Sequence, residues 1–157
     1  VRAYAGARAH LERREDLAEP SYMYFLTDAH LDCQAGYAMI AMGRQQLRLV
    51  DRAGRANITA GDRLLRRGAH EAPSNSPSGR RALYEGLWLA LGSIAVDDRD
   101  SAFALVDRAT LRLPQVNSPR SIVLLDQFAA DLRRRTRNPA VREYLPQVEE
   151  ALKKAGR

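Results

Sequence analysis

The strongest constraint on the fold comes from residues 83–114, where two apolar patterns of helical period are separated by four consecutive charged residues. In the first pattern apolar residues recur every three or four positions, which predicts a helix over residues 80–96 with one buried face. The members of that face are Leu83, Leu87, Ala90, Leu91 and Ile94. A second helix is predicted over residues 101–113, with Asp100 as its N-cap and Pro114 as its stop. Helices joined by so short a turn lie antiparallel, so this segment predicts a helical hairpin.

The remaining apolar segments also show helical spacing, and none shows the sustained alternation of a strand. The chain is therefore expected to form one domain, residues 1–157, that is all-α and consists of seven or eight helices stacked as antiparallel hairpins. Its expected parts are a leading helix in residues 1–19, a first hairpin region in 21–72, a flexible polar loop in 73–79, the best-formed hairpin in 80–114 and C-terminal helices in 118–155.

Glycine and capping residues predict where the helices begin and end. A helix that starts at Ser21 is expected to stop at Gly43. Gly54 and Gly61 weaken one continuous helix after that stop, so two shorter helices broken near residues 59–62 are an equally supported alternative. Nearer the C-terminus, a capping residue followed by proline predicts two further helix starts. These pairs are Ser118–Pro119 and Asn138–Pro139.

Composition limits the class of protein. With 45% hydrophobic and 6% aromatic residues over 157 positions, the chain can bury a core, which argues against disorder. No stretch approaches about 18 consecutive apolar residues, and the first residues lack an apolar signal-peptide core, so neither a membrane span nor a secretion signal is predicted. A single cysteine, Cys33, excludes an internal disulfide framework and fits a reducing cytoplasm. A start at Val1 in place of Met is typical of a fragment or a processed chain.

The net charge of +6 is unevenly distributed. Residues 43–81 hold nine Arg against three acidic residues, an excess equal to the entire net charge. Because Arg outnumbers Lys throughout the chain, as is typical of GC-rich genomes, a solvated or partner-facing helix surface is favoured for this region. Nucleic-acid binding through Arg48, Arg52 and Arg55 is the alternative. The run at 133–137 (RRRTR) ends a helix, where positive charge complements the helix dipole, and binding of phosphate or an acidic partner is its alternative.

The second helix of the hairpin matches the spacing of a known repeat family. Ala102, Val106 and Ala109 stand four and three residues apart, and Pro114 follows five residues further on. This small–large–small–Pro pattern resembles the second half of a tetratricopeptide repeat. Over residues 20–152, the order of segments is similar to the C-terminal repeat domain of actinobacterial helix-turn-helix (Xre-type) transcriptional regulators. Those segments read SYMYFLTDAHLDCQAG, RRALYEGLWLALG, DRDSAFALVDRATLRL, NSPR and NPAVREYLPQVEEAL.

The resemblance implies a right-handed superhelix of hairpins in which the first helix of each repeat lines a concave groove. The residues that it places at the groove are His30, Cys33, Tyr37, Ile40, Tyr84, Leu87 and Leu91. Trp88 is a further aromatic candidate, and Arg80 and Arg81 at a helix start could meet an anionic group of a ligand. The alternative for Trp88 and the tyrosines is that they fill the core between hairpins. In this family a DNA-binding helix-turn-helix domain precedes the repeats, and no convincing one occurs in this sequence, so the chain is expected to be the sensing or partner-binding part.

Few residues have the type and spacing that catalysis or metal binding needs. Asp28, His30, Asp32 and Cys33 are the one cluster of metal-ligand types. On a helix His30 points roughly opposite to the two acids, so solvated acids, a polar His and a buried thiol are expected in place of a metal site. Three His and no nucleophile or phosphate-binding motif predict neither catalytic residues nor a cofactor.

The sequence thus predicts a cytoplasmic, non-enzymatic module that binds a protein, a peptide or a small-molecule effector as the regulatory part of a transcriptional regulator. Such a module would meet DNA only through an upstream domain, and no membrane partner is expected. Two alternatives stay open. One is a stand-alone protein-interaction scaffold that forms a homodimer, and the other is a basic nucleic-acid-binding module.

Overall fold

The computed structural model describes residues 2–12, 27–47, 49–71, 79–116 and 118–156, and all regular structure in these ranges is α-helical. The helices are α1 (Arg2–Glu12), α2 (Asp28–Gln46), α3 (Asp51–Glu71), α4 (Gly79–Ala95), α5 (Arg99–Val116), α6 (Pro119–Arg133) and α7 (Pro139–Ala155). These seven helices of the described part confirm the predicted all-α fold.

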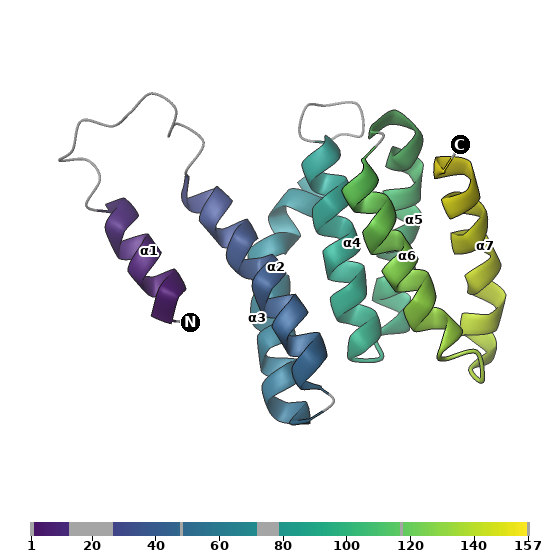
Figure 1. Cartoon of the computed structure of the whole chain (residues 1–157), viewed down its shortest axis with the longest axis horizontal. Coiled ribbons are helices and arrows are strands. Elements are labelled where there is room, and N and C mark those ends of the chain that lie inside the picture. The colour runs from purple at the N-terminus through teal and green to yellow at the C-terminus, as the bar shows by residue number, and fades with distance from the viewer. Residues whose placement is uncertain (1, 13–26, 48, 72–78, 117, 157) are drawn as a thin grey trace.

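Six of the helices form three consecutive hairpins, α2–α3, α4–α5 and α6–α7, which stack along the molecule (Figure 1). The first helices of the hairpins lie side by side in one layer, because α4 contacts both α2 and α6. Behind that layer, α3 contacts α2 and α4, and α5 contacts α4 and α7. The leading helix α1 contacts α2. The stack therefore has one surface built by the first helix of every hairpin, which we call the α2–α4–α6 face.

Helix α4 forms the centre of the core, because it contacts α2, α3, α5 and α6. Its predicted apolar side is confirmed, since all five members are fully buried (Leu83, Leu87, Ala90, Leu91 and Ile94). Burying each large apolar side chain contributes about 1.5–3 kcal/mol to folding, so α4 is a rigid support for the residues that it presents on the α2–α4–α6 face. No helix in the described ranges combines the length and apolar character needed to cross a bilayer.

Four glycines bring α2 and α3 into direct contact, among them Gly43, where the sequence predicted a stop, and Gly61, where a break was one of two alternatives. Gly43 lies inside α2, and Gly54 and Gly61 lie inside a continuous α3. A Cβ atom at Gly43 would stand 2.7 Å from the carbonyl oxygen of Gly54, and one at Gly61 would stand 2.7 Å from the carbonyl oxygen of Gly36. The two backbones therefore touch at two levels, two helical turns apart. The predicted stop at Gly43 was wrong, and of the two alternatives for the following segment the structure shows the continuous helix, α3. In both places this tertiary contact outweighs the low helix propensity of glycine, about 1 kcal/mol per residue.

Some predicted features fall outside the described residues. They are the part of the leading helix beyond Glu12, the cap at Ser21, and the loop at 73–79 except for Gly79, which begins α4. Within the described residues, α2 is capped by Thr27, whose side chain accepts a hydrogen bond from a backbone N–H of the first turn.

The other helix ends agree with the prediction in part. Ser118 and Asn138 cap α6 and α7 and are each followed by proline at the first helical position, which confirms both predicted starts. At α5, Asp98 takes the capping role predicted for Asp100, because its Oδ1 accepts a backbone N–H of the first turn at 3.2 Å. Pro114 does not stop α5, which continues to Val116, since a proline ring clashes with the preceding turn and leaves the following residues free to stay helical.

Candidate ligand-binding cleft

The α2–α4–α6 face is hollowed by a cleft of about 890 Å³ where the C-terminal halves of its three helices converge. The residues that line it are Ala41, Arg44, Gln45, Leu47, Trp88, Ala95, Gln127, Asp131, Arg134 and Arg135. A volume of this size lies in the range of small-molecule sites, roughly 300–1,000 Å³. Because each hairpin contributes through its first helix, the cleft forms only when the three hairpins are stacked.

Trp88 supplies an aromatic wall of this cleft. Its ring packs against Tyr37, with centroids 6.0 Å apart, and against Tyr84 at 6.4 Å. The two tyrosine rings meet edge to face at 5.0 Å, so the three rings form one cluster between α2 and α4. The indole Nε1 of Trp88 is buried, and within the described residues it has no hydrogen-bond partner. Trp88 therefore belongs partly to the packing between hairpins and partly to the cleft, which combines both sequence-based interpretations of this residue.

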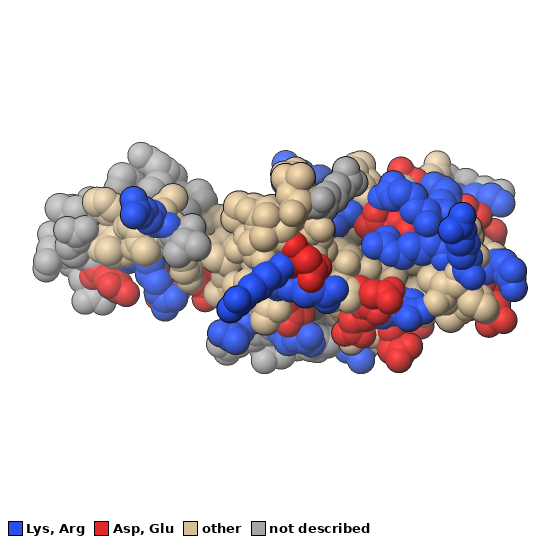
Figure 2. Space-filling view, turned by 90° about the horizontal axis from the view of Figure 1, so that it is seen from below, with Lys and Arg blue, Asp and Glu red and all other residues tan. Residues whose placement is uncertain are grey.

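Arginine side chains surround the nearly buried carboxylate of Asp131, which also lines the cleft. Arg44 Nη2 donates to Asp131 Oδ2 at 2.8 Å, and Arg134 donates to Asp131 Oδ1. Arg135 Nη1 donates to the backbone carbonyl of Asp131 at 3.1 Å. Figure 2 shows that Lys and Arg residues gather over the α6–α7 end of the molecule when it is viewed from below. One carboxylate thus serves two guanidinium groups, and the cleft retains an excess of positive charge.

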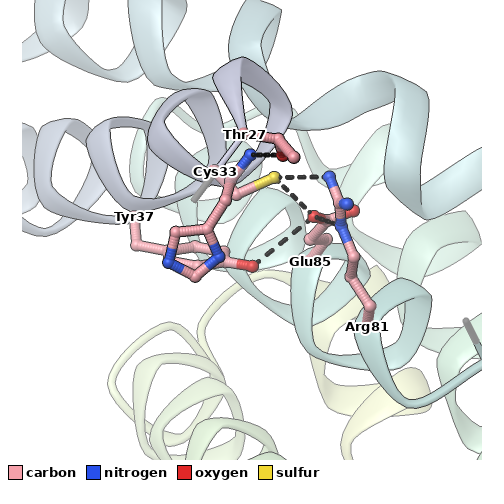
Figure 3. Close-up of polar contacts among 6 residues, drawn as sticks. Thr27, Cys33, Tyr37, Arg81 and Glu85 are labelled. Atoms are coloured by element: carbon pink, nitrogen blue, oxygen red, sulfur yellow. Dashed lines mark hydrogen bonds and ion pairs between the residues drawn. The ribbon is translucent and has the colours of Figure 1, made fainter. Parts of the chain in front are cut away.

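A second polar cluster lies between the N-terminal halves of α2 and α4 and centres on the fully buried Glu85 (Figure 3). Its Oε1 accepts hydrogen bonds from Cys33 Sγ at 2.8 Å, Arg81 Nε at 2.6 Å and Tyr37 Oη at 3.5 Å. Arg81 Nη2 also lies 2.7 Å from Cys33 Sγ. The other oxygen, Oε2, is buried without a partner among the described residues. Two of the three donors, Cys33 and Tyr37, come from α2, so they link α2 to α4 beside the aromatic cluster.

This second cluster has little nucleophilic character. Burial, with the carboxylate of Glu85 as the next cause, raises the pKa of the Cys33 thiol from its ordinary value of 9.0 to about 12. Burial also raises the pKa of the Tyr37 hydroxyl above its ordinary value. Because the thiolate and not the thiol is the nucleophile, Cys33 is unreactive near neutral pH. The cluster acts as a hydrogen-bonded connection between two helices.

The structure brings together five of the residues that the sequence placed at a groove. Cys33, Tyr37, Arg81, Tyr84 and Trp88 all belong to the two connected clusters on the α2–α4–α6 face.

The other groove candidates lie elsewhere. Ile40, Leu87 and Leu91 are fully buried in the hydrophobic core, so they face neighbouring helices and cannot contact a ligand in the cleft. Arg80 is exposed in the first turn of α4 and does not line the cleft, and His30 is partly buried near the start of α2.

Sequence reasoning missed most of the cleft residues. The sequence shows Arg44 only as a member of an Arg-rich region and gives no signal for Asp131, because their pairing joins residues 87 positions apart. In the sequence, Arg134 and Arg135 indicate only positive charge at the end of a helix. Glu85 carried one local signal, its i,i+4 spacing from Arg81, which is typical of an exposed pair and does not predict complete burial.

The arginines of the nucleic-acid alternative and the residues of metal-ligand type give no comparable site. Arg48 lies outside the described residues, and Arg52 is exposed on α3. Arg55 donates to the carboxylate of Asp51 at 2.9 Å and to the carbonyl oxygen of Val96 at 3.3 Å, so part of its charge is already neutralised. Among the described residues, no three His, Cys, Asp or Glu side chains converge as a metal site requires.

No protein-family model, curated protein or solved structure matches this chain.

Proposed function

We propose that this chain is a non-enzymatic binding module of the cytoplasm that recognises a partner or effector in the cleft of the α2–α4–α6 face. The observation that supports the proposal is the cleft itself, whose lining combines the aromatic surface of Trp88 with a cluster of guanidinium groups. Concave sites that mix apolar surface with a few convergent polar groups are the usual form of ligand sites in proteins.

The supporting walls of the cleft are suited to a preformed site. Trp88 is held by two tyrosine rings, and Arg44 and Arg134 are held by Asp131. Side chains ordered before binding lose little conformational entropy when a ligand arrives, which raises affinity for a given contact area.

The cleft also offers a route from binding to regulation. Its lining comes from all three hairpins, so a ligand that fits one relative tilt of the hairpins better than another would shift the population towards that tilt. In the Xre-type regulators that the sequence resembles, a DNA-binding domain upstream of the repeats would provide the readout. In a protein that carries both parts, the cleft ligand is expected to change the affinity for DNA, measured by fluorescence anisotropy with and without the ligand.

A steric block of the cleft tests the proposal. Ala95 lines the cleft, and Ala95→Phe would fill part of its volume. Ala104→Phe is the matched control, because Ala104 is exposed on α5 outside the cleft. Ligands found by a thermal-shift screen of peptides and metabolites are expected to stabilise the Ala104→Phe protein as they do the parent and to lose this effect with Ala95→Phe. Equal stabilisation of the two variants by every ligand would show that the cleft is not the binding site.

A further inference from the structure

We propose that the cleft binds an oxyanion, a carboxylate or a phosphate, carried on a ligand whose apolar part lies against Trp88. This inference rests on the proposed function, because it names the chemistry of the ligand that the cleft would hold.

The charges that line the cleft are not balanced. Within the described residues the lining contains three guanidinium groups and a single carboxylate, that of Asp131. Asp131 accepts from both Arg44 and Arg134, and its side chain is only 8% exposed. The pair between Arg44 and Asp131 is close to neutral, which leaves the charges of Arg134 and Arg135 in excess at a concave surface. Low-dielectric walls around a concave site focus such an excess and attract anions.

Arg135 has most of its hydrogen-bonding capacity unused. It donates from Nη1 to the backbone carbonyl of Asp131, and no carboxylate of the described chain forms an ion pair with it. A guanidinium group has five N–H donors in a planar fork that matches the oxygens of a carboxylate or phosphate. The remaining donors of Arg135, which is partly buried at the cleft, are therefore available to an oxyanion.

A purely structural role explains these arginines less well. Three helices end near the cleft, and cations at helix C-termini are favoured by the helix dipole. However, Arg133 in the same run has carboxylate partners, Glu149 at 3.0 Å and Asp126 at 3.9 Å, and it lies outside the cleft lining. Arg137, at the end of the run, also has no carboxylate partner among the described residues, but it is exposed outside the cleft lining. Arg135 is the described arginine that combines a place in the cleft lining with the lack of a carboxylate partner, since Arg44 and Arg134 both pair with Asp131.

The rest of the lining determines what must accompany the oxyanion. Trp88, Ala41, Leu47 and Ala95 present apolar surface. A small inorganic anion would leave that surface in water, whereas an aromatic or aliphatic acid would cover it. The ligand class that fits is therefore an apolar group that bears a carboxylate or a phosphate.

The single tryptophan of the chain provides a direct test, because Trp88 gives one indole N–H signal in a ¹H–¹⁵N correlation spectrum. Four probes share a phenyl group and differ in charge: benzoate, phenyl phosphate, benzyl alcohol and benzylamine. Benzoate and phenyl phosphate are expected to shift the Trp88 signal and to bind roughly tenfold more tightly than the alcohol or the amine. The ratio between benzoate and phenyl phosphate distinguishes a carboxylate ligand from a phosphate ligand.

Two double variants separate the cleft from the general charge of the protein. Arg134→Gln with Arg135→Gln is expected to weaken benzoate binding about tenfold. Arg137→Gln with Arg142→Gln removes the same charge from exposed positions outside the cleft lining. This second variant is expected to bind benzoate with an affinity within about twofold of that of the parent. Far-ultraviolet circular dichroism confirms that each variant is folded.

The outcomes distinguish this inference from the proposed function. If benzyl alcohol binds as tightly as benzoate, or if both double variants bind benzoate equally, the cleft binds ligands without selecting an oxyanion and only this inference fails. If none of the four probes shifts the Trp88 signal, the oxyanion site is likewise overturned, and the proposed function is then decided by the comparison of Ala95→Phe with Ala104→Phe.

Discussion

Arg44 of α2 and Asp131 of α6 form an ion pair of 2.8 Å that connects the first hairpin to the third. The two residues are 87 positions apart, and their side chains are 20% and 8% exposed. Solvent and salt screen such a pair far less than one on the open surface. Both residues line the cleft, so the pair contributes both to stacking of the hairpins and to the shape of the proposed site.

Asp131→Ala is expected to destabilise the fold by about 2 kcal/mol, because it leaves the largely buried guanidinium group of Arg44 without its carboxylate. Arg134 is 60% exposed and can turn towards water, so its lost ion pair adds little. The measurement is the free energy of unfolding in urea, followed by circular dichroism. Asp126→Ala is the matched control, since Asp126 is 66% exposed and lies 3.9 Å from Arg133. The control is expected to lower the free energy of unfolding by less than about 0.5 kcal/mol. Equal losses of unfolding free energy in the two variants would contradict a special role of Asp131.

Gly43→Ala is expected to destabilise the fold by about 2 kcal/mol or more, because the new Cβ would meet backbone atoms of Gly54 and Ile58 that cannot move independently. Gly86→Ala in α4 is the matched control. A Cβ at Gly86 meets no atom within 4 Å, so this change is expected to stabilise the helix by about 0.5–1 kcal/mol. Thermal unfolding of the two variants should shift in opposite directions, and a shift in the same direction would contradict backbone contact between α2 and α3.

Glu85→Ala is expected to destabilise the fold by about 3 kcal/mol, because it removes the shared acceptor of Cys33 and Tyr37 and leaves a cavity. Arg81 can turn towards water, so its lost ion pair adds little to this cost. Glu85→Gln keeps the shape and is expected to cost less than Glu85→Ala. Urea unfolding measures the change in the free energy of unfolding for both variants. Glu143→Ala on the exposed side of α7 is the control, and its change is expected to be near zero. A change near zero for Glu85→Ala would show that the cluster contributes no stability.

Stability is expected to fall at alkaline pH through Cys33. The folded state raises the pKa of its thiol from 9.0 to about 12, so the unfolded chain loses this proton first as the pH rises. The contribution of the thiol to stability is therefore complete below pH 9.0 and is lost as the pH rises from 9.0 towards about 12. At most this single group contributes a slope of about 1.4 kcal/mol per pH unit.

Cys33→Ala isolates that contribution. Above pH 9.0 the free energy of unfolding of the variant is expected to fall less steeply with pH than that of the parent. At about pH 7–8, below the thiol pKa of both the folded and the unfolded state, the thiol stays protonated in both states, so the two slopes should agree. Urea titrations at a series of pH values give the slopes. Identical slopes for parent and variant above pH 9.0 would contradict a raised thiol pKa.

Local patterns predicted the hairpin architecture, because they record contacts between residues close in sequence. The apolar side of α4 and the caps at Ser118 and Asn138 follow from helical period and capping chemistry, and the structure confirms them. The helix stop predicted at Gly43 was wrong because glycine is unfavourable in an isolated helix. Its small size stabilises the fold only when Gly54 of the neighbouring helix packs against it.

The site was less predictable than the fold. Tyr37, Tyr84 and Trp88 were candidate groove residues in the sequence, but neither their contact with one another nor their connection to the buried Glu85 was predicted. A charged residue on a helix normally indicates a solvated side, and only the placement of Cys33 and Tyr37 from another helix makes burial of Glu85 favourable. The pairing of Arg44 with Asp131 depends on the stacking of three hairpins, which helix periodicity does not specify.

The glycine contacts between α2 and α3 also bear on the order of folding. Gly43 and Gly54 are close along the chain, so their contact closes a short loop at a small entropic cost. Glycine has no side-chain rotamers to order, and the contact therefore requires no repacking of long side chains. We expect α2 and α3 to pair early, because local contacts form faster than distant ones. The cleft, which joins residues from three hairpins, would then be completed last.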